Sequence, residues 1–78
     1  MTWRIRWTRS ALGALKAMPW PHAAAIDRAV MRLAAAGEGA DRVEGAPHLA
    51  RLRVGSYAAL LELDPAARVI VVLWVLRS

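Results

Sequence analysis

The hydrophobic pattern changes period along the chain and predicts six elements. Residues 3–7 alternate large apolar side chains with arginine, as in a strand that has one apolar and one cationic face. Apolar residues at helical spacing follow over residues 8–18, where a threonine or serine can cap the helix. Pro21 suits the first turn of a second helix that runs to about Ala36, and Gly37 suits its C-terminal cap.

A hairpin of two strands is expected after residues 38–47, which form a charged, glycine-rich loop without periodicity. Leucine and valine alternate with arginine over residues 49–54, so this strand also has an apolar and a cationic face. Gly55-Ser56 suits a two-residue turn, because the first central position of a type II′ turn needs a positive φ. Such a turn places Val54 opposite Tyr57, from which the second strand returns antiparallel.

The last strand is expected after a four-residue turn over residues 64–67. This turn places Leu63 opposite Arg68 and Tyr57 opposite Trp74. Tyr57 would then point toward the helices, so packing is its expected role. The other face of the two strands would carry Ala58, Leu60, Glu62, Val69, Val71, Leu73, Val75 and Arg77.

The element order, β-α-α-β-β-β, predicts a single α+β domain over residues 1–78, in which a two-helix hairpin covers one face of an antiparallel sheet. Hydrophobic residues make up 58% of the chain, which is more than so small a body can bury. A covering partner or an oligomer is therefore expected. The longest apolar run is too short to span a bilayer and no secretory signal is visible, so we expect a cytoplasmic protein without membrane association.

The charge of the chain is strongly positive. Eleven lysines and arginines face six acidic residues, which gives a net charge of +5, and ten of the eleven are arginine. Arginine suits forked contacts with phosphate or carboxylate, so a nucleic acid or an acidic protein partner is indicated. The alternative is ordinary solvated surface encoded by a GC-rich genome, which is how we interpret Arg9, Arg28, Arg32 and Arg42.

Five arginines are expected on the sheet face that the helices leave uncovered, where they suit a phosphate backbone. They are Arg4, Arg6, Arg51, Arg53 and Arg77. The alternative is the solvated side of a half-exposed sheet, and this interpretation is preferred for Arg4 and Arg6. The same face would carry the apolar residues that we expect a partner to cover, namely Leu60, Val71, Leu73 and Val75.

The stretch RLRVGSY, residues 51–57, resembles the RelE/ParE superfamily of bacterial toxins, in which this segment reads roughly Arg-Leu-Arg-Val-Gly-Asp-Tyr-Arg. The order of elements is similar too, so the resemblance covers almost the whole chain. Ser56 stands where aspartate is common, and Ala58 stands where arginine is usual. The resemblance implies a toxin of a type II toxin–antitoxin module that a cognate antitoxin covers. The chain has two histidines and no paired-ligand spacing, so no cofactor or metal ion is expected.

In the RelE branch, the resemblance further implies mRNA cleavage in the ribosomal A site, with Arg51, Arg53 and Arg77 at basic positions of the catalytic site. Cleavage also needs groups that move protons, which arginine does not supply because it stays protonated. The sequence ends at Ser78, where the family continues with an arginine and a tyrosine, so we expect these groups to be missing. The other proton-transfer candidates, for which surface or packing roles are expected, are His22, His48, Tyr57 and Glu62.

Two alternatives to a ribosome-dependent endoribonuclease remain open. The ParE branch has the same fold without the nuclease residues and is understood to poison DNA gyrase. The leucines of residues 72–77 are more typical of that branch. A catalytically disabled relative that acts only as a binding module is the third interpretation, for which Ala58 and the short ending are the signals.

Overall fold

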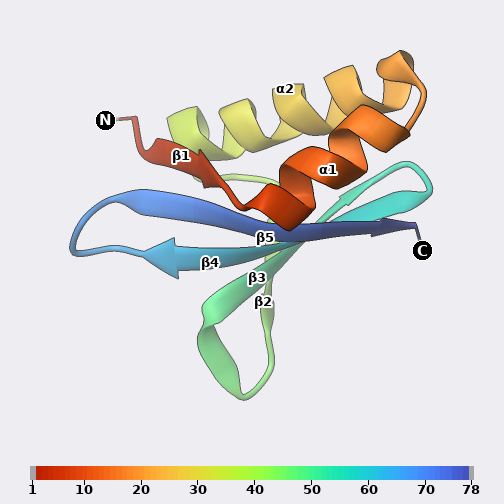
Figure 1. Cartoon of the computed structure of the whole chain (residues 1–78). Helices are drawn as coiled ribbons and strands as arrows, with labels where there is room; N and C mark the ends of the chain where they lie inside the picture. The colour runs from red at the N-terminus through yellow and green to blue at the C-terminus, as the bar shows by residue number, and fades with distance from the viewer. Residues whose placement is uncertain (1, 78) are drawn as a thin grey trace.

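The computed structural model describes residues 2–77 and consists of two helices on one face of a five-stranded sheet (Figure 1). In chain order the elements are β1 (Arg4–Trp7), α1 (Arg9–Ala17), α2 (Trp20–Ala36), β2 (Ala40–Val43), β3 (Ala46–Val54), β4 (Tyr57–Asp64) and β5 (Val69–Arg77). The strand order across the sheet is β1-β5-β4-β3-β2. The expected α+β fold with a helical hairpin on one face is confirmed.

Two features of the sheet differ from the sequence prediction. The charged segment expected as a loop contains β2, which pairs with β3 and forms one edge of the sheet. Its pairing shifts register between Arg42 and Val43, and the tip of this hairpin bends away from the sheet (Figure 1). At the other edge, β1 pairs with β5 in parallel, whereas all the other pairs are antiparallel.

Each helix begins and ends as its residues predict. Thr8 caps α1, because its Oγ1 accepts a hydrogen bond from the Ala11 N–H at 3.1 Å. Proline occupies the first turn of α2, where its missing N–H is not needed. Gly37 ends α2 in the left-handed conformation, with φ of 72°, and its N–H donates to the Leu33 carbonyl at 2.8 Å.

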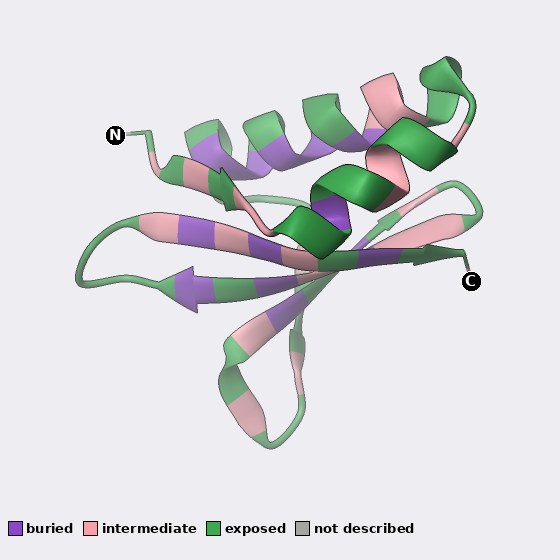
Figure 2. Ribbon diagram, in the orientation of Figure 1, coloured by how far each residue is buried: buried purple, intermediate pink, exposed green. Residues whose placement is uncertain are grey.

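The core lies between α2 and the central strands of the sheet. Its largest fully buried side chains are Ile26, Leu61, Ile70, Val30 and Val72. Burying side chains of this size stabilises the fold by about 1.5–3 kcal/mol each. Buried positions alternate with half-buried or exposed ones along β4 and the first half of β5, so one face of these strands packs under the helices (Figure 2).

A β-bulge in β5 reverses the faces of its second half. Leu61 pairs with Val72 but Leu60 pairs with Trp74, so Leu73 has no partner in β4. After this extra residue the side chains exchange sides. Val75 is therefore only 6% exposed, beneath the helices, whereas Trp74 is 47% exposed.

The predicted register of the last hairpin was wrong because of the bulge and because the turn was misplaced. The turn lies one residue later than expected, so Asp64 pairs with Val69. The Asp64 side chain stabilises this turn by accepting a hydrogen bond from the Ala67 N–H at 3.2 Å. Tyr57 pairs with Arg77 and not with Trp74, although it does pack against the core as predicted.

Candidate functional site

The strand registers define the side of the sheet that faces away from the helices, which is called the open face below. It carries Arg4, Arg6, Leu49, Arg51, Arg53, Ala58, Leu60, Glu62, Asp64, Val69, Val71, Trp74 and Leu76. Its residues form rows across the strands. In the central row, Arg51 lies opposite Leu60, which lies opposite Trp74. In the next row, Arg53 lies opposite Ala58, which lies opposite Leu76.

The arginines of the open face form two pairs near opposite edges of the sheet. Arg51 and Arg53 lie on β3, and Arg4 and Arg6 lie on β1, where they pair with Val69 and Val71 of β5. Strands β4 and β5 separate the pairs, so they are three strand spacings, or about 14 Å, apart. Four of the five arginines predicted for this face are therefore on it, but they do not converge on one point.

Arg77 does not lie on the open face, which corrects the sequence prediction. It pairs with Tyr57, whose side chain packs against the core, so it projects toward the helix side of the sheet. The same correction applies to Val75, which is buried beneath the helices and is not available to a partner. Leu73 is the unpaired residue of the bulge. Of the predicted partner-binding residues, Leu60 and Val71 are on the open face, both half-buried.

An apolar strip separates the two arginine pairs. It consists of Leu60, Val69, Val71, Trp74 and Leu76, which come from β4 and β5. The two residues that project furthest are Trp74, which is 47% exposed, and Leu76, which is 59% exposed. Neither was predicted for this face, because the bulge that turns them outward leaves no signal in the hydrophobic pattern.

A shallow hollow in the open face surrounds Ala58. It has a volume of about 220 Å³, and its lining includes Arg51, Leu60, Trp74 and Leu76. The small side chain of Ala58 leaves this space, at the position where the resemblance leads one to expect an arginine. The hollow therefore combines one guanidinium group with an aromatic ring and two aliphatic side chains, a set that suits recognition of a flat or apolar group.

An acidic residue that the sequence prediction missed lies beside this hollow. Asp41 of β2 is directly opposite Arg51, so a carboxylate is the cross-strand neighbour of that guanidinium on the edge side. Opposite charges at such positions stabilise strand pairing by roughly 0.2–1 kcal/mol. Asp41 was missed because its segment was taken for a loop.

Two of the candidate proton carriers lie away from the open face. The rings of His22 and Tyr57 contact each other on the helix side of the sheet, with their centroids 5.3 Å apart. His48 lies in the first half of β3 and lines a hollow of about 350 Å³ together with Glu62 and Asp64. Glu62 is the one candidate on the open face, where it pairs with Val71. Among residues 2–77, no histidine or tyrosine has a strand pairing that places it on this face, but His48 lies beside Glu62 in one hollow.

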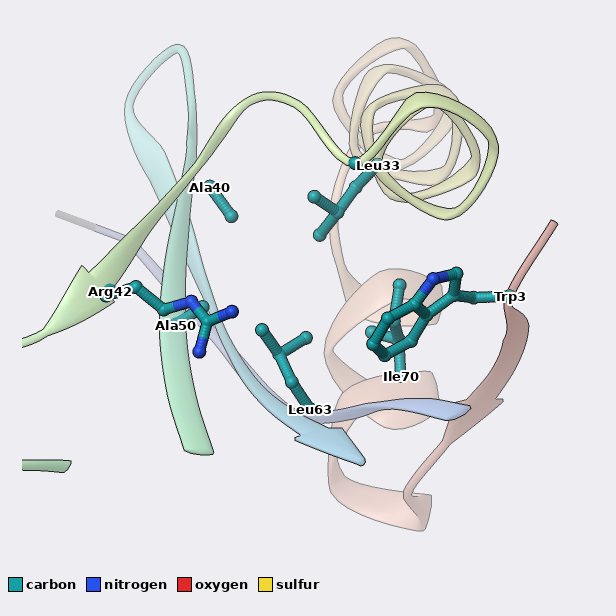
Figure 3. Close-up of a pocket in the computed structure, with 8 residues that line it drawn as sticks. Trp3, Leu33, Ala40, Arg42, Ala50, Leu63 and Ile70 are labelled. Atoms are coloured by element: carbon teal, nitrogen blue, oxygen red, sulfur yellow. The ribbon is translucent and has the colours of Figure 1, made fainter. Parts of the chain in front are cut away.

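A separate pocket of about 120 Å³ lies on the helix side of the sheet, between the end of α2 and the β2–β3 hairpin (Figure 3). Its walls are apolar and include Trp3, Leu33, Leu63 and Ile70. Arg42 extends along one side of it, and its Nη1 donates to the Pro47 carbonyl at 2.5 Å. Because this guanidinium is hydrogen-bonded within the β2–β3 hairpin, we describe the pocket as a packing gap at the edge of the core.

No family model and no curated protein matches the sequence. Solved structures match along its whole length. A chain of the RelBE2 toxin–antitoxin complex from Mycobacterium tuberculosis is 21% identical, with 100% of both chains covered and a TM-score of 0.85. A mutant of E. coli toxin RelE in the free state is 14% identical, with 99% of this chain and 84% of that chain covered and a TM-score of 0.87. This chain has the RelE fold.

A further structure with the RelE fold is the archaeal RelE–RelB complex from Pyrococcus horikoshii. It is 21% identical, with 99% of this chain and 96% of that chain covered and a TM-score of 0.75. The RelE fold is therefore matched along nearly the entire chain, although few of its residues are shared. No helix among the described residues is long and apolar enough to cross a membrane.

Proposed function

We propose that this chain is the toxin of a type II toxin–antitoxin module, that it arrests translation through its open face, and that a cognate antitoxin blocks this face. The RelE fold supports the toxin assignment, and neighbours with this fold include toxin–antitoxin complexes. The observation that carries the proposal is the composition of the open face. Two arginine pairs flank an apolar strip, so anionic and apolar groups can bind side by side.

The antitoxin contact follows from the surplus of apolar surface. Trp74 and Leu76 project from a face that no element of this chain covers among the described residues. An antitoxin segment would place apolar side chains on this strip and acidic side chains against Arg51 and Arg53. Desolvated apolar contacts at the centre with charged contacts around them are the usual arrangement of a specific interface.

The action on translation rests on the same arginines. Arg51 and Arg53 are two residues apart on one strand, so their Cα atoms are about 6.6 Å apart along β3, a spacing that allows the two side chains to contact successive phosphates of a single strand. Arginine stabilises the charge of a phosphate during cleavage but cannot supply the proton transfers. Asp41, Glu62 and Asp64 are the carboxylates that the strand registers place on this face, and we propose that any mRNA cleavage relies on Glu62 as the base.

A toxin relative that binds without cutting is a second candidate, and the hollow around Ala58 favours it. The usual arginine is replaced by a methyl group, and Trp74 and Leu76 line the space that results. This surface is better suited to an apolar side chain than to a cleaved phosphate. On this interpretation the chain binds its partner and cleaves no RNA.

The proposal can be tested by inducing the chain in a bacterial host and labelling new protein and new DNA separately. We expect protein synthesis to stop first, and the double substitution R51Q/R53Q to prevent the arrest. R9Q is the matched control, because Arg9 is exposed on α1 and away from the open face. An early loss of DNA synthesis would instead indicate a ParE-type gyrase inhibitor. If neither process responds, the chain is a binding module without toxicity.

A further inference from the structure

The outer side of α2 carries large apolar residues that contact nothing in the described chain well enough to be buried. Trp20 is 78% exposed and Met31 is 55% exposed. Together with Ala24 and Ala35 they recur at intervals of four, seven and four residues, which keeps all four on one face of the helix. This face is opposite the buried side of α2, which packs on the sheet (Figure 2).

A hollow lies at the C-terminal end of the same face. Arg28, Met31, Arg32 and Ala35 line it, and its volume is about 380 Å³. Its walls are the methionine side chain, the alanine methyl group and the aliphatic parts of two arginines. A site of this kind suits an indole ring, because the ring can pack on the apolar walls while a guanidinium lies over its face. The exposed indole of Trp20 is at the other end of the helix.

We propose that this face binds a second copy of the chain, with the two α2 helices antiparallel about a two-fold axis. In the proposed register, Trp20 of one copy lies opposite Ala35 of the other, and Met31 lies opposite Ala24. Each large side chain then faces a small one, and each Trp20 enters the partner's hollow. A two-fold axis repeats both contacts, so the face is complementary to itself.

The charged residues at the centre are compatible with this pairing. The axis passes between Asp27 and Arg28, which places the carboxylate of each copy at the level of the partner's guanidinium. The alanines allow the helices to approach closely. One helix pair buries less than the roughly 800 Å² per partner of a standard interface, so we expect a dissociation constant in the micromolar range.

The dimer would leave the proposed functional surface free. The outer side of α2 and the open face lie on opposite sides of the molecule, because the sheet and the core separate them (Figure 1). Two copies joined through α2 would therefore present two open faces that point away from each other. The dimer does not depend on the proposed function, and an inactive chain would also form it.

The oligomeric state should be measured on the purified chain by analytical ultracentrifugation between about 1 and 300 μM, a range set by the expected micromolar affinity. We expect the wild type to shift from monomer to dimer over this range. W20A should weaken the dimer at least tenfold, because a buried tryptophan is a typical energetic centre of an interface. M31E should have a similar effect, because it replaces an apolar wall of the hollow with a hydrated carboxylate that the partner's indole would have to desolvate.

L12A is the matched control, because Leu12 is an exposed apolar residue of α1 outside this face, and its loss should leave the dimer unchanged. The register has its own test. The chain contains no cysteine, so R28C introduces a thiol next to the proposed axis, and mild oxidation should link two copies through it. L12C should not be linked. A wild type that is monomeric at 300 μM, or a dimer that W20A and M31E leave intact, would overturn the proposal.

Discussion

Thr8 connects α1 and β5 through one hydroxyl group. Its Oγ1 accepts a hydrogen bond from the Ala11 N–H at the start of α1 and donates one to the carbonyl of Leu73, the unpaired residue of the β5 bulge, at 2.5 Å. Its backbone N–H also donates to Val72 at 3.1 Å, which continues the pairing of β1 with β5. The helix N-terminus and the bulge are therefore held by the same side chain.

We expect T8V to lower the free energy of unfolding by about 1–2 kcal/mol, because it removes the cap and leaves the Leu73 carbonyl without this donor. Urea unfolding followed by circular dichroism measures the change. S10A is the control, because Ser10 is exposed and lies two residues after Thr8 in the first turn of α1. This substitution should change the free energy of unfolding by less than about 0.5 kcal/mol. Equal effects of the two substitutions would mean that Thr8 has no special role.

Ala58 allows the nuclease interpretation to be tested at a single position. The hollow beside it can hold a longer side chain, so A58R would place a guanidinium next to Arg51 without disturbing the core. If the chain cleaves mRNA, A58R should increase cleavage, measured by mapping new 5′ ends in induced cells. A58Q fills the same space without a charge and should not. A toxin that acts on gyrase should respond to neither substitution.

At the scale of elements, the hairpin of β3 and β4 was predicted correctly and the end of β5 was not. The Gly55-Ser56 turn fixes the first hairpin by local chemistry, since Gly55 adopts φ of 59° and Val54 pairs with Tyr57. The bulge in β5 depends on a hydroxyl group 65 residues away, which no local pattern reveals. Because β5 is apolar at nearly every position, the side chains of either face could be buried in the core.

The β2 strand was missed for a related reason. Its residues, Ala40–Val43, are mostly charged or small, and an edge strand at the margin of the core shows no clear apolar alternation. The open-face positions of Arg51, Arg53, Arg4 and Arg6 could be predicted, since each lies on a strand with strict alternation. The open-face positions of Trp74 and Leu76 could not be predicted, because both residues follow the bulge.

The gap between α2 and the β2–β3 hairpin gives a prediction about stability. Ala40 points into it (Figure 3), so A40V would fill part of the space and suit a strand better than alanine. We expect an increase in the free energy of unfolding of about 0.5–1 kcal/mol. Thermal unfolding can detect this change. A46V, in the same hairpin but outside the gap, is the matched control and should stabilise the chain less.

At the scale of the whole molecule, the two arginine pairs predict different effects on RNA binding. An RNA strand that follows β3 would contact Arg51 and Arg53, whereas Arg4 and Arg6 lie across the apolar strip. We expect R51Q/R53Q to reduce the salt dependence of binding to single-stranded RNA by about 1.4 in the slope of log K against log salt concentration. R4Q/R6Q should leave the slope unchanged. Fluorescence anisotropy at several salt concentrations measures both, and equal slopes would indicate non-specific attraction to the net charge.

The extra residue in β5 also affects how this chain should be compared with its structural neighbours. Up to Val72, strict alternation assigns each side chain to the correct side of the strand. Beyond Leu73 the count is offset by one, so continued alternation would place Arg77 on the open face, whereas the backbone turns it to the helix side. Roles transferred to the C-terminal part of this strand should therefore follow spatial superposition, and residue type alone will mislead.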